Sequence, residues 1–130
     1  MLRLLTLLVS LVCATLSAQS AYEAEMQKAL QIFDEGKTTE ASTIFEKIAP
    51  AETNNWLPLY YISLTNTFEA FGTKDKEKVY RLLTKAQEAQ DKAVLISPEN
   101  PELLVMQAMI HTAWIAHDPM TNGMRLSRKV

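Results

Sequence analysis

Apolar residues recur at helical spacing along the chain from residue 21 onward. The first helix is predicted over 21–35, where steps of four, four and three place one apolar face: Tyr22, Met26, Leu30 and Phe33. Gly36 follows as a C-terminal cap. A second helix is predicted over 38–49, with Ala41, Ile44, Phe45 and Ile48 on one face and Pro50 after it.

Three longer helices are predicted in the rest of the chain. The third begins near Asn54 or Asn55, tolerates Pro58 in its first turn and ends at Gly72. Its broad apolar and aromatic surface consists of Trp56, Leu57, Tyr60, Tyr61, Leu64, Phe68 and Phe71. The fourth helix runs from about Asp75 to Ile96, with Val79, Leu83, Ala86, Ala93 and Ile96 facing inward. No segment has the period of a strand.

The junction between the fourth and fifth helices has the strongest local signals. Pro98 cannot continue a helix, Asn100 is a favourable N-cap, and Pro101 suits the first helical position. Helices joined by turns this short must lie antiparallel.

The fifth helix is predicted over 101–117 and is apolar on most sides, so it requires cover on most sides. Asp118-Pro119 breaks it, only a short tail follows, and residues 127–130 resemble another helix start. We therefore expect that the chain is a truncated part of a longer protein. Alternatively, the uncovered last helix mediates self-association.

The N-terminal segment has the pattern of a secretory signal: basic Arg3, a short apolar run and small residues at 17–21. We predict a signal peptide over 1–18, with cleavage as late as 21 as an alternative, and a helical domain over 19–130. An uncleaved anchor is the other interpretation, although the run is shorter than the roughly 20 residues that span a bilayer. Cys13 lies in this segment, so the mature chain has no cysteine.

The charge balance argues against nucleic acid as a partner. The sequence has 13 basic and 15 acidic residues, and loss of Arg3 leaves the mature chain with a net charge of about −3. The two signs are interspersed, without a basic groove. After cleavage, no remaining segment is suited to stable membrane insertion.

Small residues at matching positions indicate a repeat. They are Ala29, Gly36 and Ala41, with Phe45, in the first unit, and Ala86, Ala93, Pro98 and Ala108 in the later one. This pattern resembles the tetratricopeptide repeat (TPR), as found in exported bacterial proteins, with units of about 34 residues. The resemblance implies an all-α fold of antiparallel hairpins, stacked as a short right-handed solenoid whose last hairpin is incomplete.

Catalytic and metal sites find little support in the sequence. His111 and His117 are six apart and lie on different helix faces, whereas zinc-binding helices use a four-residue spacing. The three glycines are isolated, so no phosphate loop is formed. The sequence predicts no enzyme activity and no cofactor.

Three aromatic residues, Trp56, Tyr60 and Tyr61, are the candidates for partner binding. Rigid aromatic side chains supply contact area for a peptide, but aromatic residues at helical spacing more often form core. The function expected is an exported scaffold in the periplasm or outside the cell that binds a protein or peptide. The alternatives are the helical part of a larger envelope enzyme and a self-associating structural unit.

Overall fold

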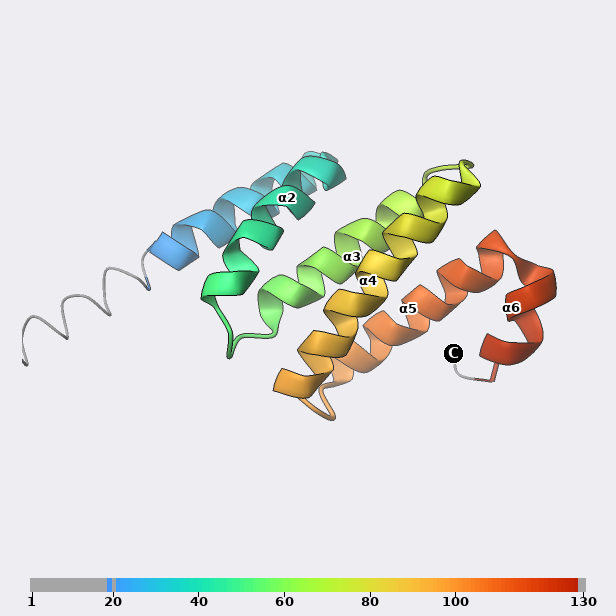
Figure 1. Ribbon diagram of the computed structural model, residues 1–130. Helices are drawn as coiled ribbons and strands as arrows, with labels where there is room; N and C mark the ends of the chain where they lie inside the picture. The colour runs from blue at the N-terminus through green and yellow to red at the C-terminus, as the bar shows by residue number, and fades with distance from the viewer. Residues whose placement is uncertain (1–18, 20, 129–130) are drawn as a thin grey trace, which may run out of the picture.

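The computed structural model describes residue 19 and residues 21–128, and all regular structure in them is helical (Figure 1). A first helix covers 21–34. The others are α2 (Thr38–Ile48), the short 3-10 helix η1 (Ala49–Ala51), α3 (Leu57–Phe71), α4 (Lys76–Ile96), α5 (Pro101–His117) and α6 (Pro119–Leu126). The prediction of an all-α fold is confirmed. The predicted signal peptide, including Cys13, lies outside the described residues.

Local chemistry explains where these helices begin and end. Gly36 ends the first hairpin turn with φ of 80°, a left-handed conformation that favours glycine. The Asp75 and Asn100 side chains each accept a hydrogen bond of 3.0 Å from a backbone N–H of the helix that they precede. Asn100 therefore matches the predicted cap, whereas Asp75, predicted as the start of the fourth helix, is the cap that precedes it. At the same junction, Glu99 has a φ of 61° without being glycine.

The region after His117 differs from the prediction. In place of a tail, α6 forms a further helix, and Ser127 is its C-cap instead of a new helix start. The Asp118 carboxylate accepts a hydrogen bond of 3.1 Å from the Thr121 N–H, and Pro119 occupies the first helical position. The Asp-Pro pair breaks α5, but it also caps the next helix, and that second role was missed.

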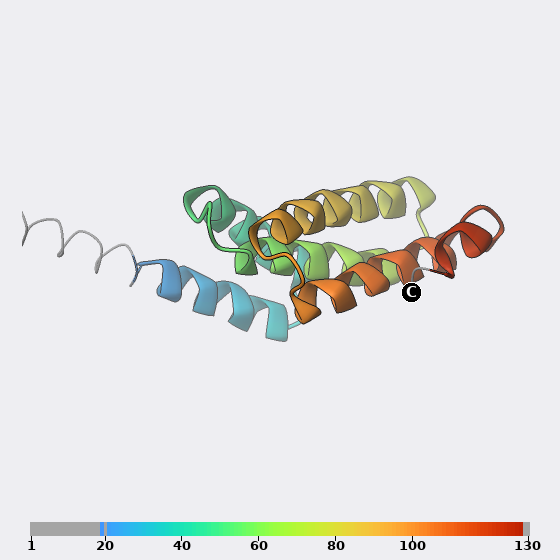
Figure 2. The same ribbon diagram turned by 90° about the horizontal axis from the view of Figure 1, so that it is seen from below.

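The helices form two layers, as Figure 2 shows: the first helix, α3 and α5 lie in one, and α2 and α4 in the other. Successive helices run antiparallel (Figure 1). One core cluster joins the first helix, α2 and α3 around buried Phe45, and two further clusters join α3, α4 and α5. Among the described residues, no helix has both the length and the apolar composition needed to cross a bilayer.

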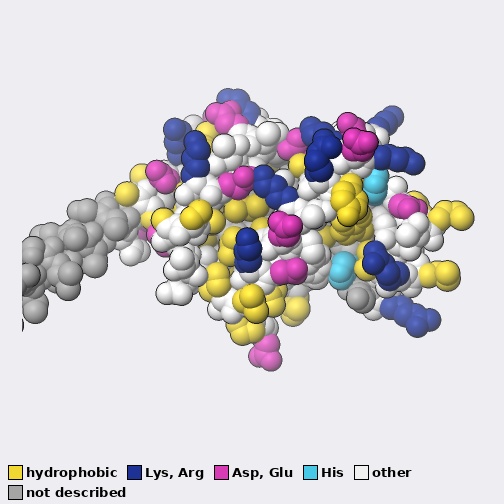
Figure 3. Space-filling model, in the orientation of Figure 1, with side chains coloured by type: hydrophobic (Ala, Val, Ile, Leu, Met, Phe, Trp, Pro, Cys, Tyr) yellow, Lys and Arg dark blue, Asp and Glu magenta, His cyan; other side chains and the backbone are white. Residues whose placement is uncertain are grey.

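Most predicted core positions of α4 are buried, namely Val79, Leu83, Ala86 and Ala93. Ile96 is the exception, since it is only half-buried. Ile96 is the last residue of α4, and the turn that follows it covers less of its side chain than a packed helix would. The outer surface carries interspersed charges of both signs, as Figure 3 shows for one face.

Candidate partner-binding surface

Helix α3 buries polar side chains as well as apolar ones. The buried residues of this helix include four with polar side chains: Ser63, Thr65, Asn66 and Thr67. A helix on a protein surface normally buries apolar residues and exposes polar ones. The sequence left two interpretations open for the aromatic residues of this helix, core packing and partner binding.

The buried hydroxyls of α3 are stable because their hydrogen bonds are satisfied. Thr65 and Thr67 each donate a bond of 2.8 Å to a carbonyl four residues earlier in the helix. Ser63 donates a bond of 2.9 Å to the Ala86 carbonyl of α4. Such small, satisfied side chains permit close approach of the two helices without the cost of an unpaired polar group.

Beside these hydroxyls, α3 has a row of apolar side chains that we call the α3 stripe: Tyr60, Tyr61, Leu64, Phe68 and Phe71. Tyr61 stacks on Phe45 with ring centroids 4.9 Å apart. Tyr60 packs beside the cluster that contains Met106 of α5. Tyr61 therefore contacts α2, and Tyr60 lies beside α5.

The far end of the stripe is open to solvent. Phe68 and Phe71 are 47% and 48% exposed, although the Phe68 ring lies 6.0 Å from that of Phe33 in the first helix. Both rings are large enough to contribute substantial contact area to a partner.

The three predicted binding residues lie together, but at the part of the stripe nearest the core. The Trp56 and Tyr60 rings meet edge to face with centroids 5.9 Å apart, and those of Tyr60 and Tyr61 are 5.2 Å apart. Burial raises the pKa of both tyrosine hydroxyls, and negative charge on Glu102 adds to this effect. The structure thus gives these residues a packing role and adds Phe68 and Phe71 as exposed members.

The predicted repeat positions have different environments. Those with fully buried side chains are Ala29, Ala41, Phe45, Ala86 and Ala93. Ala108 is half-buried, and Pro98 lies exposed in the turn after α4. These burials fit close helix contacts, except at Ala108.

Glu69 connects three helices beside the stripe. Its carboxylate accepts a hydrogen bond of 2.8 Å from Thr39 of α2 and forms an ion pair of 2.8 Å with Lys78 of α4. Burial alone would raise the pKa of Glu69, but these donors and the positive charge of Lys78 lower it overall. The ionised carboxylate therefore contributes to holding α2, α3 and α4 together.

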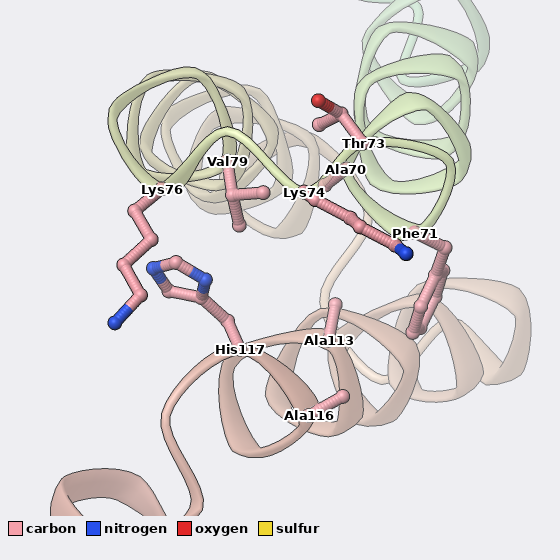
Figure 4. Close-up of a pocket in the computed structure, with 9 residues that line it drawn as sticks. All are labelled: Ala70, Phe71, Thr73, Lys74, Lys76, Val79, Ala113, Ala116 and His117. Carbon is pink, nitrogen blue, oxygen red and sulfur yellow. The ribbon is translucent and has the colours of Figure 1, made fainter.

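A cavity of about 290 Å³ lies where the end of α3, the start of α4 and the end of α5 meet (Figure 4). Its lining consists of Ala70, Phe71, Thr73, Lys74, Lys76, Val79, Ala113, Ala116 and His117. Phe71 is shared with the α3 stripe, so the cavity adjoins the exposed end of that surface.

The two histidines have separate surroundings. His117 lines the cavity, whereas the Nε2 atom of His111 lies 2.9 Å from the Gln107 amide nitrogen. No group of three His, Cys, Asp or Glu side chains that could hold a metal occurs within 21–128. The two histidines accordingly do not form a shared site.

The α3 stripe is the most distinctive surface of the described chain, because two of its aromatic rings are about half exposed and lie one turn from buried hydroxyls of the same helix. Any role of the α3 stripe is therefore inferred from the contacts and exposure of its own side chains. No protein-family model, curated protein or solved structure matches the chain.

Proposed function

We propose that this protein is an exported, non-catalytic helical scaffold with TPR-like stacking, and that it binds a protein or peptide partner along the α3 stripe. The supporting observation is the orientation of α3. This helix buries Thr65 and Thr67 while leaving Phe68 and Phe71 about half exposed. The two half-exposed rings leave apolar surface in contact with water, and a partner segment can cover that surface.

Along the stripe, the aromatic rings change from packed against the core to exposed to solvent. Tyr60 and Tyr61 are held by core contacts on either side of α3, and the rings beyond them are free on one face. Rings that are already fixed lose little conformational freedom on binding. An apolar segment of a partner, with side chains spaced to meet successive turns of α3, suits this arrangement.

The test combines capture from an envelope extract with a variant that leaves the fold intact. Phe68→Gln should abolish capture of the specific partner, while the melting temperature changes little because the ring is half exposed. Leu95→Gln is the matched control, because Leu95 is an exposed apolar residue on α4, outside the stripe. A partner retained equally by both variants would refute binding along α3.

Self-association is a second candidate, supported by the surface of the last two helices. Met120 and Met124 of α6 are 92% and 89% exposed, and apolar side chains project from the α6 end of the molecule in Figure 3. Leu104 and Val105 of α5 are also exposed. Light scattering coupled to size-exclusion chromatography should then show a dimer that Met120→Glu and Met124→Glu together dissociate. A monomer at all concentrations would exclude this candidate.

A further inference from the structure

The cavity between α3, α4 and α5 has an apolar floor. Val79 and Ala113 line it and are almost fully buried, and Ala70 joins them from α3. Alanine at positions 70, 113 and 116 leaves space that longer side chains would fill. A volume of about 290 Å³ is near the lower end of small-ligand pockets, which begin at roughly 300 Å³.

The rim of the cavity is positively charged. In Figure 4 the Lys74 side chain extends across the opening toward Phe71, and the His117 ring lies between Lys76 and Val79. No carboxylate oxygen of the described residues lies within 4.0 Å of the Lys74 or Lys76 ammonium group. Figure 4 shows the Lys74 ammonium over the opening and the Lys76 ammonium directed outward beyond His117, so Lys74 is the nearer cation for an anionic ligand.

Nearby acidic side chains are directed to other groups. Asp75 accepts the hydrogen bond from the Lys78 N–H that caps α4, and Asp118 accepts the one from Thr121 that caps α6. Glu77 lies 3.9 Å from the Arg81 guanidinium on the exposed side of α4. The lining itself contains no acidic residue.

We propose that this cavity binds a small organic carboxylate. The apolar body of the ligand lies against Val79 and Ala113, its carboxylate lies at the rim beside Lys74, and Lys76 adds positive charge from the other side of the opening. An apolar pocket with a few convergent polar groups is the usual form of a small-ligand site. A carboxylate on a compact apolar body matches both the apolar floor and the positively charged rim. The carboxylate can belong to a free acid or to the end of a peptide. This inference does not depend on partner binding along the α3 stripe.

The experiment is a titration followed by the amide chemical shifts of the protein, with phenylacetate as the probe. We expect saturable binding at roughly millimolar concentration, the affinity typical of so small a ligand, with shifts centred on Phe71, Val79 and Ala113. Neutral phenylacetamide should bind about tenfold more weakly, because it lacks the charge. A peptide ending in phenylalanine with a free carboxylate, compared with its amide, distinguishes a chain end from a free acid as the source.

Variants separate the contribution of the rim from that of the floor. The double variant Lys74→Gln and Lys76→Gln should weaken binding about tenfold with an unchanged melting temperature, since both side chains are exposed. Lys92→Gln, also exposed on α4, is the charge control. Ala116→Leu should fill the space and abolish binding, whereas Thr112→Leu on the same helix should not.

Three results would overturn the proposal. They are equal binding of phenylacetate and its amide, shifts located away from the cavity, and unchanged affinity in the double lysine variant. Absence of saturation by both the free acid and the free-carboxylate peptide would also overturn it. Loss of partner capture by Phe68→Gln is measured separately, so failure of one proposal leaves the other testable.

Discussion

Helix α4 makes two interfaces that are built from different side chains. Toward α3 it presents alanines, and Ser63 of α3 donates directly to the Ala86 carbonyl at 2.9 Å. Toward α5 it presents glutamines: Gln87 and Gln107 exchange two amide hydrogen bonds of 2.9 Å. Gln90, fully buried, donates to the Leu103 carbonyl.

The difference shows two ways of satisfying polar groups between helices. The α3 hydroxyls bond mainly to carbonyls of their own helix, so they take up little space between the helices. Helix α4 accordingly packs along α3 more extensively than along α5. Long amides bridge from one helix to the next and fix their register. An amide can also leave one of its own atoms unpaired, because Oε1 of Gln90 is buried without a hydrogen-bond partner in the described part of the chain.

The largest expected effect tests whether apolar packing, rather than the amides, stabilises the α4–α5 interface. Ile110 is fully buried in the cluster with Ala86 and Met106. Ile110→Ala should lower the free energy of unfolding by about 2–5 kcal/mol in denaturant titration. Leu104→Ala on an exposed face of α5 is the control and should change it by less than about 0.5 kcal/mol. Equal effects would show that the cluster contributes little.

Overpacking tests the close contact of α4 with α3. Ala86→Leu should cost roughly 1–3 kcal/mol in thermal melts, because the added atoms meet a fully packed site. Ala41→Leu and Ala93→Leu should behave alike, since both side chains are also fully buried. Ala24→Leu, on the exposed side of the first helix, should have no such effect. Melts of all three core variants that match the parent would contradict the close packing.

Acid titration tests the electrostatic link on the α3 side of α4. The pKa of Glu69 is lowered below its ordinary value of 4.5 in the folded protein. Its stabilising effect is therefore complete above that value and is lost as the pH falls through the folded pKa. Glu69→Gln should cost about 1–2 kcal/mol near neutral pH, since hydrogen bonds to a charged group are lost.

The cost of Glu69→Gln should shrink steadily below about pH 4.5, where the parent carboxyl also becomes neutral. Glu77→Gln is the matched control, because its carboxylate is exposed and lies 3.9 Å from Arg81. It should change stability by less than about 0.5 kcal/mol at any pH. A pH-independent cost of Glu69→Gln would mean that packing, rather than charge, accounts for its role.

The smallest effect concerns the amide pair between α4 and α5. Gln107→Leu alone should cost about 0.5–1.5 kcal/mol, because Gln87 Oε1 loses its donor, whereas Gln87 Nε2 keeps its bond of 2.7 Å to Asp91 Oδ1. The double change Gln87→Leu with Gln107→Leu should recover most of that loss, since both partners then become apolar. A double-mutant cycle measures the coupling. Strictly additive costs would indicate that the pair does not act as a unit.

The sequence predicted the positions of the helices better than their orientations. Caps and breakers are local, so Gly36, Asp75 and Asn100 indicated their boundaries correctly. The orientation of α3 could not be predicted, because it depends on which neighbour satisfies Ser63 and stacks on Tyr61. The exposed end of the stripe and the cavity were missed for the same reason. The cavity requires Lys74, Val79 and Ala113 to meet from separate elements.

The aromatic contacts of α3 with the first hairpin have a consequence for how this chain folds. Tyr61 needs Phe45 of α2, and Phe68 lies beside Phe33 of the first helix, so neither ring has its native cover until the first hairpin is in place. We therefore expect the first hairpin and the α3–α4 pair to unfold as one cooperative unit, because aromatic rings of each half cover those of the other.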